Sequence, residues 1–216
     1  ILSSLGANTE GSQFLEPDGH FPNHIPNPEN PEAMASVCKA VEDCNADLGV
    51  IFDTDVDRSA IIGRNGQPIN RNSLIALIST VILEEHPGST IVTDSVTSDG
   101  LAEFISQKGG KHHRFRRGYK NVINEGIRLN GMGEECWLAI ETSGHAALRE
   151  NHFLDDGAYL ATKVVIKAAQ LIKEGKSLDQ LISSLEKPAE AMEIRMKLNV
   201  EDFGAYGDGV LGWLKA

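Results

Sequence analysis

Hydrophobic and polar residues follow two different periods along this chain, and its first part predicts a helix, a strand and a hairpin. Asn30 is a typical helix N-cap, Pro31 suits the first helical position, and apolar side chains follow at helical spacing. A short apolar run at 46–52 predicts a buried strand. The apolar segments on either side of Asn65-Gly66 predict a hairpin closed by a type I′ turn.

From residue 72 onward, helical and strand patterns alternate. Helices are predicted at 72–85, 98–108, 119–130, 156–174 and 177–186. Strands are predicted at 90–94, 112–116, 136–141 and 191–200, and the last of these begins a further unit. Because such alternation implies crossover connections between parallel strands, the predicted fold class is α/β. We expect mixed, largely parallel sheets with helices on both faces, arranged as two adjacent similar domains.

Both ends of the chain read as cut, so we expect a fragment of a longer protein. Residues 1–6 resemble the end of a helix, and the chain closes on an apolar run at 209–216. Residues 11–30 hold four prolines and two glycines, too many for a regular element. Any targeting segment would lie outside the printed residues.

Composition and charge narrow the classes of partner. The formal net charge is −11, which argues against a nucleic acid or an anionic membrane surface but allows a small anionic substrate. The longest apolar stretch, 74–83, is too short to span a bilayer and predicts a buried helix. Cys38, Cys44 and Cys136 have the spacing of neither a disulfide framework nor a zinc site. We therefore expect a soluble protein of a reducing compartment, the cytoplasm or an organelle such as a plastid.

The first candidate site is the segment DTDVDR at 53–58, directly after a predicted strand. Asp53, Asp55 and Asp57 alternate in a tight loop, where three carboxylates repel one another unless a cation lies between them. Hard oxygen ligands of this kind suit Mg²⁺, and Arg58 offers a forked donor for a phosphate group. A solvated acidic turn is the alternative interpretation.

Two other metal-binding motifs also contain alternating aspartates, and this segment excludes one of them and leaves the other open. An EF-hand needs glycine and glutamate at its sixth and twelfth positions, and Arg58 and Arg64 stand there, which excludes it. A haloacid-dehalogenase-type phosphatase begins with an apolar strand and two alternating aspartates, which Asp53 and Asp55 match. Asp57 stands where that class has threonine or valine. This phosphatase stays open as the alternative function.

The second candidate site is ETSGH at 141–145, at the end of another predicted strand. Glu141 and Ser143 are two residues apart and point the same way in an extended chain, so they can bind neighbouring hydroxyl groups of a sugar. Gly144 allows a ligand to approach the backbone. An ordinary turn at a strand end would have a similar composition.

A basic cluster at 111–120 is the third candidate. Its members are Lys111, His112, His113, Arg114, Arg116, Arg117 and Lys120, with Tyr119 among them. The cluster predicts either a wall that faces a phosphate group opposite the first site, or a solvated strand and helix start, and the sequence favours neither.

The motifs occur in an order that resembles the α-D-phosphohexomutases, the family of phosphoglucomutases, phosphomannomutases and phosphoglucosamine mutases. The order is DGHFPNH at 18–24, PNPE at 26–29, DTDVDR at 53–58, ETSGH at 141–145 and DDG at 155–157. The resemblance covers residues 6–200 and implies four domains around one cleft in the whole protein. It implies that 1–72 is part of domain 2, that 73–188 is domain 3 and that 189–216 begins domain 4.

The resemblance also implies a metal and a reaction. Asp53, Asp55 and Asp57 correspond to the family's magnesium ligands, and Arg58 to the arginine that follows them, which we expect to be catalytic. The implied enzyme is a Mg²⁺-dependent intramolecular phosphotransferase. It transfers phosphate from a phosphoserine to a hexose phosphate, and the bisphosphate turns over in the cleft before it returns a phosphate.

Residues that bind the sugar phosphate follow from the same resemblance. Glu141, Ser143 and His145 correspond to the family's sugar-binding loop, and Gly118, next to Arg117 of the basic cluster, corresponds to a family glycine. The implied substrates are phosphates of glucose, mannose or glucosamine.

The sequence departs from the family at several positions. Thr54 and Val56 replace two glycines of the metal loop; a left-handed backbone would be strained at a β-branched residue, so we expect slightly different metal geometry. Tyr119 stands where some members have histidine. The 216 residues contain no phosphoserine motif of the Ser-His-Asn-Pro type, nor the phosphate loop of domain 4. We therefore expect this chain alone to be inactive, and a non-catalytic paralogue that binds metal or sugar phosphate is a further alternative.

Overall fold

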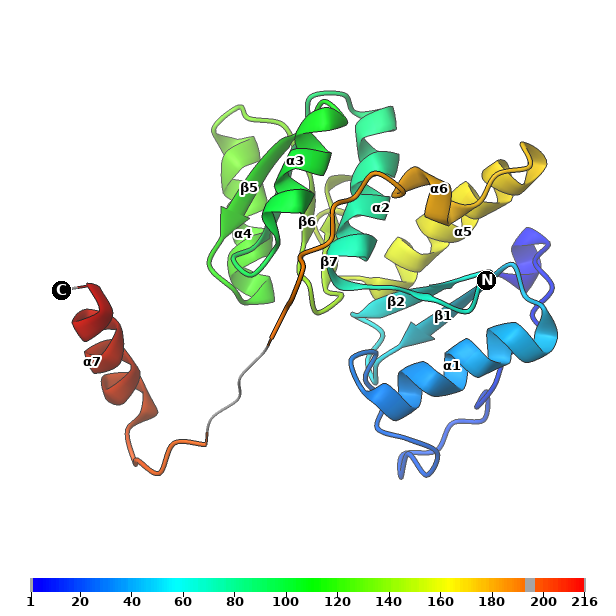
Figure 1. Ribbon diagram of the computed structural model, residues 1–216, viewed down its shortest axis with the longest axis horizontal. Coiled ribbons are helices and arrows are strands. Elements are labelled where there is room, and N and C mark those ends of the chain that lie inside the picture. Colours follow the sequence, from blue (N-terminus) through cyan, green and yellow to red (C-terminus); the bar gives the residue numbers. More distant parts are fainter. Residues whose placement is uncertain (1, 193–196, 216) are drawn as a thin grey trace.

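The computed structural model describes residues 2–192 and 197–215. The first sheet along the chain is small and antiparallel (Figure 1). The strand order is β1-β2-β3, with β1 at Leu48–Phe52, β2 at Ser59–Gly63 and β3 at Pro68–Ile69. Helix α1 (Pro31–Cys44) covers one face and helix α5 (Gly157–Lys173) contacts the other. Alternation along β2 explains this arrangement, because Ala60 and Ile62 pack with α1 while Ile61 joins the core that contains α5.

The larger sheet has the strand order β5-β4-β6-β7. Its strands are β4 (Thr90–Asp94), β5 (Lys111–Phe115), β6 (Cys136–Ile140) and β7 (Ala146–Leu148). Strand β4 runs parallel to β5 and β6, whereas β7 is antiparallel to β6. The fold class is α/β, as predicted, with a mixed, largely parallel sheet in this part of the chain.

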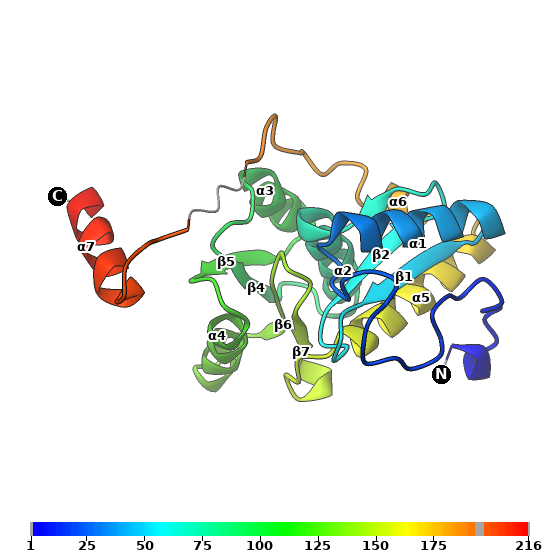
Figure 2. The same ribbon diagram turned by 90° about the horizontal axis from the view of Figure 1, so that it is seen from below.

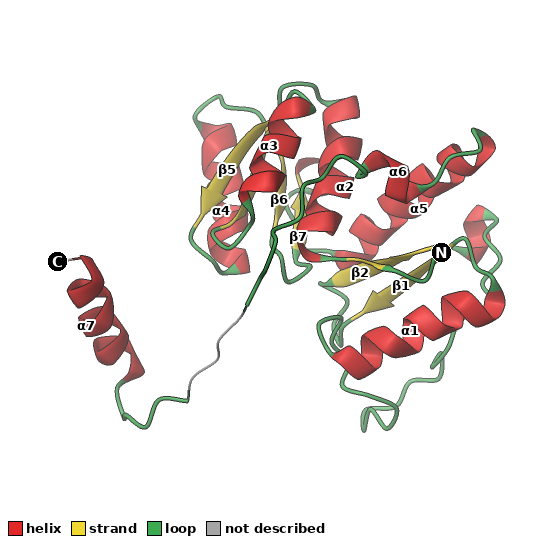
Figure 3. Ribbon diagram, viewed as in Figure 1, coloured by secondary structure: helices red, strands yellow, loops and turns green. Residues whose placement is uncertain are grey.

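Helices lie on both faces of the larger sheet (Figures 2 and 3). They are α2 (Arg71–Glu85) and α3 (Asp99–Gln107) on one face and α4 (Tyr119–Gly131) on the other. Helix α2 also contacts α5 and the short α6 (Leu178–Leu181), so every side chain from 74 to 83 is buried. The apolar stretch is therefore a core helix, as expected. Within the described residues, no helix combines the length and apolar character needed to cross a membrane.

Helix α1 begins as predicted, but the hairpin turn differs. The Asn30 side chain accepts hydrogen bonds from the N–H groups of Glu32 and Ala33, each at 3.0 Å. The predicted type I′ turn is wrong, because such a turn needs a positive φ at both central residues. Gly66 has a φ of 72°, but the φ of Asn65 is not positive. Asn65 instead accepts a side-chain hydrogen bond from the N–H of Gln67, which suits a right-handed residue followed by a left-handed glycine.

The last part of the chain differs most from the expected elements. The helix predicted at 177–186 is the shorter α6, and β7 and the helix α7 (Phe203–Lys215) were not predicted. Of the strand predicted at 191–200, residues 193–196 lie outside the described residues, and the described ones on either side form no strand.

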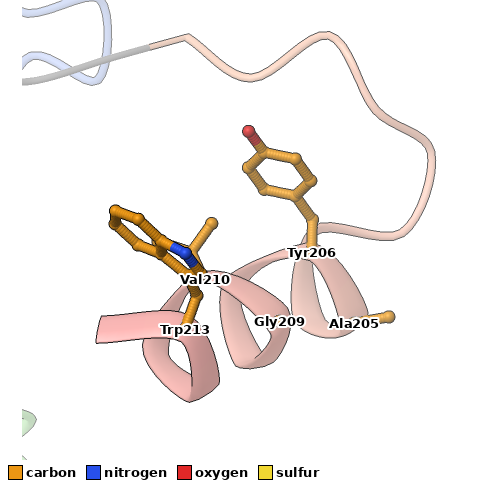
Figure 4. A pocket seen from close by; sticks show the side chains of 5 residues that line it. All are labelled: Ala205, Tyr206, Gly209, Val210 and Trp213. Atoms are coloured by element: carbon orange, nitrogen blue, oxygen red, sulfur yellow. The ribbon is translucent and has the colours of Figure 1, made fainter. Parts of the chain in front are cut away.

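Helix α7 lies apart from both sheets (Figures 1 and 2). None of its described side chains is buried. A shallow apolar hollow on it is lined by Ala205, Tyr206, Gly209, Val210 and Trp213, all of α7 itself (Figure 4). This hollow lies away from the two candidate sites.

Candidate functional site

The two loops predicted to carry chemistry lie side by side. Loop 53–58 follows β1 of the small sheet, and loop 141–145 follows β6 of the larger one. The backbones of Arg58 and His145 form an antiparallel bridge. Helix α5 packs on the small sheet and thereby joins the two halves of the chain, which brings both strand ends to one place.

The three aspartates of loop 53–58 converge. One carboxylate oxygen from each of Asp53, Asp55 and Asp57 lies within 4.8 Å of the other two. Burial raises the pKa of Asp57 to about 6; the charge of His145 opposes this, and Asp53 and Asp155 reinforce it. Asp57 Oδ1 is buried and accepts no hydrogen bond within the described chain. An orphaned buried oxygen beside two more carboxylates fits a hard divalent cation.

Arg58 closes this loop onto its first aspartate. Its Nε donates to Asp53 Oδ2 at 2.7 Å, and its backbone N–H donates to Asp53 Oδ1 at 3.1 Å. Burial alone would raise the pKa of Asp53, but the Arg58 contacts outweigh it and the pKa is lowered. Arg58 Nε also lies 3.8 Å from Asp57 Oδ1. Arg58 therefore neutralises part of the charge within the loop.

Val56 has a left-handed backbone with a φ of 65°. This conformation is unfavourable for a β-branched residue because its Cβ crowds the backbone. The strain anticipated where the family has glycine is therefore present, and it lies between two of the three aspartates.

Loop 141–145 holds a buried carboxylate. Glu141 Oε1 accepts a hydrogen bond from the Gly118 N–H at 2.6 Å, and Glu141 Oε2 accepts one from Ser143 Oγ at 3.3 Å. Burial raises the pKa of Glu141, although the Gly118 N–H opposes this. Gly118 has a φ of 118°, a conformation that favours glycine. Glu141, Ser143 and Gly118 are thus brought together.

His145 joins the two loops through its side chain. Its Nδ1 lies 2.7 Å from Asp155 Oδ2 and 3.5 Å from Asp57 Oδ2. Tyr119 stacks on the imidazole with ring centroids 4.7 Å apart. Burial alone would lower the pKa of His145, but Asp155 and Asp57 outweigh it and the pKa is raised.

Two carboxylates of the candidate site were not predicted as individual residues. Asp155 orients His145 and also accepts a hydrogen bond from the Ala146 N–H at 3.1 Å. The available signal was the DDG segment at 155–157. Asp94 is fully buried and accepts from the Thr142 N–H and Oγ1, at 3.2 and 2.7 Å. Asp94 could have been predicted from its position at the end of β4, the strand next to the one that Glu141 directly follows.

The basic cluster divides into two parts. His112 Nε2 lies 2.8 Å from Thr93 Oγ1, and Arg114 pairs with Asp99 at 2.8 Å, so these side chains stabilise β5 and its neighbours. Arg117 lies near the second loop, with its Nε 3.9 Å from Asp94 Oδ2. His112 and Arg114 are therefore held by contacts with β4 and with the start of α3, whereas Arg117 lies near Asp94.

A hollow of about 180 Å³ opens beside the second loop. It is lined by residues 142–144, by the start of α2 and by residues of the proline-rich segment 28–31. Ser143 and Gly144 therefore border open space. Gly144 also lies beside Arg58 of loop 53–58, which we call the carboxylate loop.

Comparison with known families matches most of the chain. Residues 1–66 match the family described as phosphoglucomutase/phosphomannomutase, alpha/beta/alpha domain II. Residues 70–188 match domain III of the same family.

Similar proteins carry related names. A phosphomannomutase/phosphoglucomutase of Pseudomonas putida is 30% identical over 194 residues, which cover 89% of this chain and 40% of that protein. A phosphoglucomutase of Neisseria gonorrhoeae is 29% identical over 87% of this chain and 40% of its own length. This chain thus spans about two-fifths of the length of these relatives.

Solved structures resemble the same region. A phosphoglucomutase/phosphomannomutase family protein from Burkholderia thailandensis has a TM-score of 0.68 and 29% identity over 79% of this chain and 35% of its own. The pp63/parafusin phosphoprotein of Paramecium has a TM-score of 0.58 over 76% of this chain and 30% of its own. At 18% identity, the second structure supports the fold alone.

Proposed function

The chain belongs to the phosphoglucomutase/phosphomannomutase family, and from this we propose that its two loops hold the metal and the sugar of a phosphohexose mutase. The observation that carries the proposal is the backbone bridge between Arg58 and His145, which sets the carboxylate loop against the second loop. The whole protein would be an intramolecular phosphotransferase of carbohydrate metabolism. Its phosphoryl donor would be a phosphoserine that lies outside these 216 residues.

Asp53, Asp55 and Asp57 would hold Mg²⁺. The convergence of the three carboxylates and the orphaned oxygen of Asp57 support this assignment. A bound Mg²⁺ would draw charge from a phosphoryl oxygen during transfer. Arg58 would hold Asp53 in place and add positive charge at the same position.

The second loop would bind a hexose phosphate. Ser143 and the edge of Glu141 offer hydrogen-bonding atoms for sugar hydroxyls, and His145 lies between this loop and the carboxylates. Gly118 and Arg117 would complete the subsite, because Gly118 bonds to Glu141 and Arg117 contributes a nearby positive charge. Phosphates of glucose, mannose and glucosamine are the candidate substrates.

We propose the domain limits as 1–72, 73–188 and 189–216. The first would be part of the family's domain 2 with the metal loop, the second its domain 3 with the sugar loop, and the third the start of domain 4. The separate sheets and the isolated position of α7 support a division into three parts. The first limit falls just inside α2, which begins at Arg71.

The phosphatase alternative would use Asp53 as its nucleophile. That carboxylate is buried, and both of its oxygens accept hydrogen bonds from Arg58. A carboxylate held in this way is poorly placed to attack a phosphoryl group, so the geometry favours the mutase.

Asp55→Asn tests the metal site. Asp55 is exposed, so the fold should be kept while Mg²⁺ loses a charged ligand and its affinity falls sharply. Calorimetric titration of the chain with MgCl₂ measures this, with Asp47→Asn, at another exposed aspartate, as the matched control. Unchanged Mg²⁺ affinity in Asp55→Asn would contradict the assignment of Asp55 as a metal ligand.

Glu141→Gln tests the second loop. The substitution keeps shape but removes the charge that strengthens the bonds from Gly118 and Ser143, so binding of glucose 1-phosphate should weaken while Mg²⁺ affinity stays the same. Glu10→Gln, at an exposed glutamate, is the control. An equal fall in Mg²⁺ affinity would assign Glu141 to the metal site instead.

Incubation with glucose 1-phosphate and Mg²⁺ separates mutase from phosphatase. We expect neither isomerised sugar phosphate nor free phosphate, because the printed residues include no phosphoserine motif. Release of phosphate that disappears in Asp53→Asn would overturn the mutase proposal, and isomerised product would place the donor within this chain.

A further inference from the structure

Helix α5 begins directly against the backbone of the carboxylate loop. Its first residue, Gly157, donates its N–H to the Val56 carbonyl at 3.0 Å. A Cβ on Gly157 would lie 2.7 Å from the Arg58 carbonyl carbon and 2.9 Å from the carbonyl oxygens of Arg58 and Val56. These are backbone atoms, which cannot rotate away as the end of a side chain can. Position 157 therefore needs glycine because a side chain would not fit. Its backbone conformation is not the reason, because its φ lies outside the left-handed range.

The residue that receives this hydrogen bond is the strained one. Val56 lies between Asp55 and Asp57, and its φ of 65° is disfavoured for a β-branched side chain. Its side chain is 38% exposed, so packing around the valine is a weak restraint. A return of Val56 to a right-handed or extended backbone would turn the two aspartates away from each other. Contacts from outside position 56 must therefore hold this conformation.

Two sets of contacts do so from different parts of the chain. Within the loop, the Arg58 N–H and Nε bind Asp53. From the other half of the molecule, Gly157 binds the Val56 carbonyl, and the Asp156 side chain caps α5 by accepting from the Tyr159 N–H at 2.8 Å. The carboxylate loop thus rests on the start of a helix that lies about a hundred residues further along the chain.

We propose, on the basis of the proposed function, that Gly157 is a positioning residue for the metal loop. By hydrogen bonding to the Val56 carbonyl and leaving room for the Arg58 backbone, it holds Val56 left-handed so that Asp55 and Asp57 converge with Asp53. Gly157 touches neither metal nor substrate and acts through the backbone of the loop.

Gly157→Ala is the direct test, read by calorimetric titration of the 216-residue chain with MgCl₂. The added methyl group displaces the loop, and Mg²⁺ affinity should fall roughly tenfold or more, as for other residues that orient metal ligands. Gly131→Ala is the neutral control, because a Cβ there meets no described atom within 4 Å. Gly126→Ala controls for instability, since its Cβ would crowd the side chains of Phe153 and Cys136, neither of which belongs to the loop at 53–58.

Two further measurements separate positioning from packing. In a Val56→Gly background the left-handed backbone is no longer strained, so Gly157→Ala should reduce affinity less than it does beside valine. Hydrogen exchange at the amides of 54–58 should accelerate in Gly157→Ala but not in Gly126→Ala. If Gly157→Ala does not fold, a comparison of Asp156→Ala with Asp156→Asn takes its place. Asparagine can still cap the start of α5 and alanine cannot, so only Asp156→Ala should lose Mg²⁺ affinity.

The outcomes distinguish this inference from the proposed function. Wild-type affinity in a folded Gly157→Ala, an equal loss in Gly126→Ala, or the same loss in both backgrounds at position 56 would overturn the role of Gly157. If the wild-type chain binds no Mg²⁺, the metal proposal fails instead. Hydrogen exchange would then still decide whether Gly157 holds the loop.

Discussion

Val56 is the residue where conformation and sequence disagree most. A left-handed backbone costs a non-glycine residue about 1–2 kcal/mol, and Val56 adopts one with a φ of 65°. Val56→Gly relieves this strain, but glycine gives back roughly 0.5–1 kcal/mol because it loses more backbone entropy on folding. The free energy of unfolding should therefore rise by up to about 1 kcal/mol. Urea denaturation measures the change. Val96→Gly, at an exposed valine without positive φ, should destabilise, and the same sign for both variants would contradict the strain at Val56.

Asp94 depends on one residue of the second loop for its buried charge. Thr142 donates both its N–H and its hydroxyl to Asp94, which is fully buried. Thr142→Val removes the hydroxyl and leaves the carboxylate short of a donor, so the free energy of unfolding should fall by about 1–3 kcal/mol. Thr162→Val is the control, because that hydroxyl binds the Ala158 carbonyl of its own helix. Equal effects would mean that Asp94 has no special need of Thr142.

At the scale of elements, strand β5 carries a histidine that the fold keeps neutral. Burial, aided by the charges of Arg114 and His113, lowers the pKa of His112 to about 4. The unfolded chain binds this proton near pH 6.5, so between pH 6.5 and about 4 the unfolded state holds more protons and gains stability relative to the fold. The contribution of His112 is present above pH 6.5 and is lost as the pH falls.

His112→Gln tests this dependence. The side chain can still bond to Thr93 but cannot titrate, so the variant should lose less stability than the wild type between pH 7 and pH 5. Urea titrations at both pH values give the difference. If wild type and variant lose the same amount, other groups cause the acid sensitivity.

At the scale of the whole molecule, one large core extends across the two sheets. Ile61 and Ile69 of the small sheet belong to the same buried cluster as Leu160 of α5 and Leu138 of the larger sheet. This continuity implies that the halves around the site unfold together. It also explains how two loops from different sheets come to lie side by side.

Ile61→Ala tests this cooperativity. It should lower the free energy of unfolding by about 2–5 kcal/mol and leave one transition, seen alike by circular dichroism and by Trp137 fluorescence. Trp137 lies in β6 of the larger sheet, and a Trp213→Phe background removes the signal of α7. Ile166→Ala, at a side chain that is 48% exposed, should change stability by less than about 0.5 kcal/mol. Two separate transitions would show that the halves unfold independently.

The sequence alone determined both loops of the candidate site and, apart from the short strand β7, the main helices and strands from Pro31 to Lys173. These features depend on local patterns: an N-cap such as Asn30, apolar periodicity, and polar residues directly after buried strands. The carboxylate spacing at 53–57 likewise indicated a shared ligand, because alternating side chains in a short loop are close whatever the fold.

Tertiary structure decided how these parts meet, because their partners come from distant segments. Asp155 reaches His145 only because the chain turns after β7 and returns along it, where Ala147 and Asp155 form an antiparallel bridge. Gly157 reaches Val56 only because α5 packs on the small sheet. Within the basic cluster, only the pairing of β5 with β4 brought the His112 side chain to the Thr93 hydroxyl. A sequence pattern states which side chains a segment offers, whereas packing of the whole chain selects the groups that satisfy their charges and hydrogen bonds.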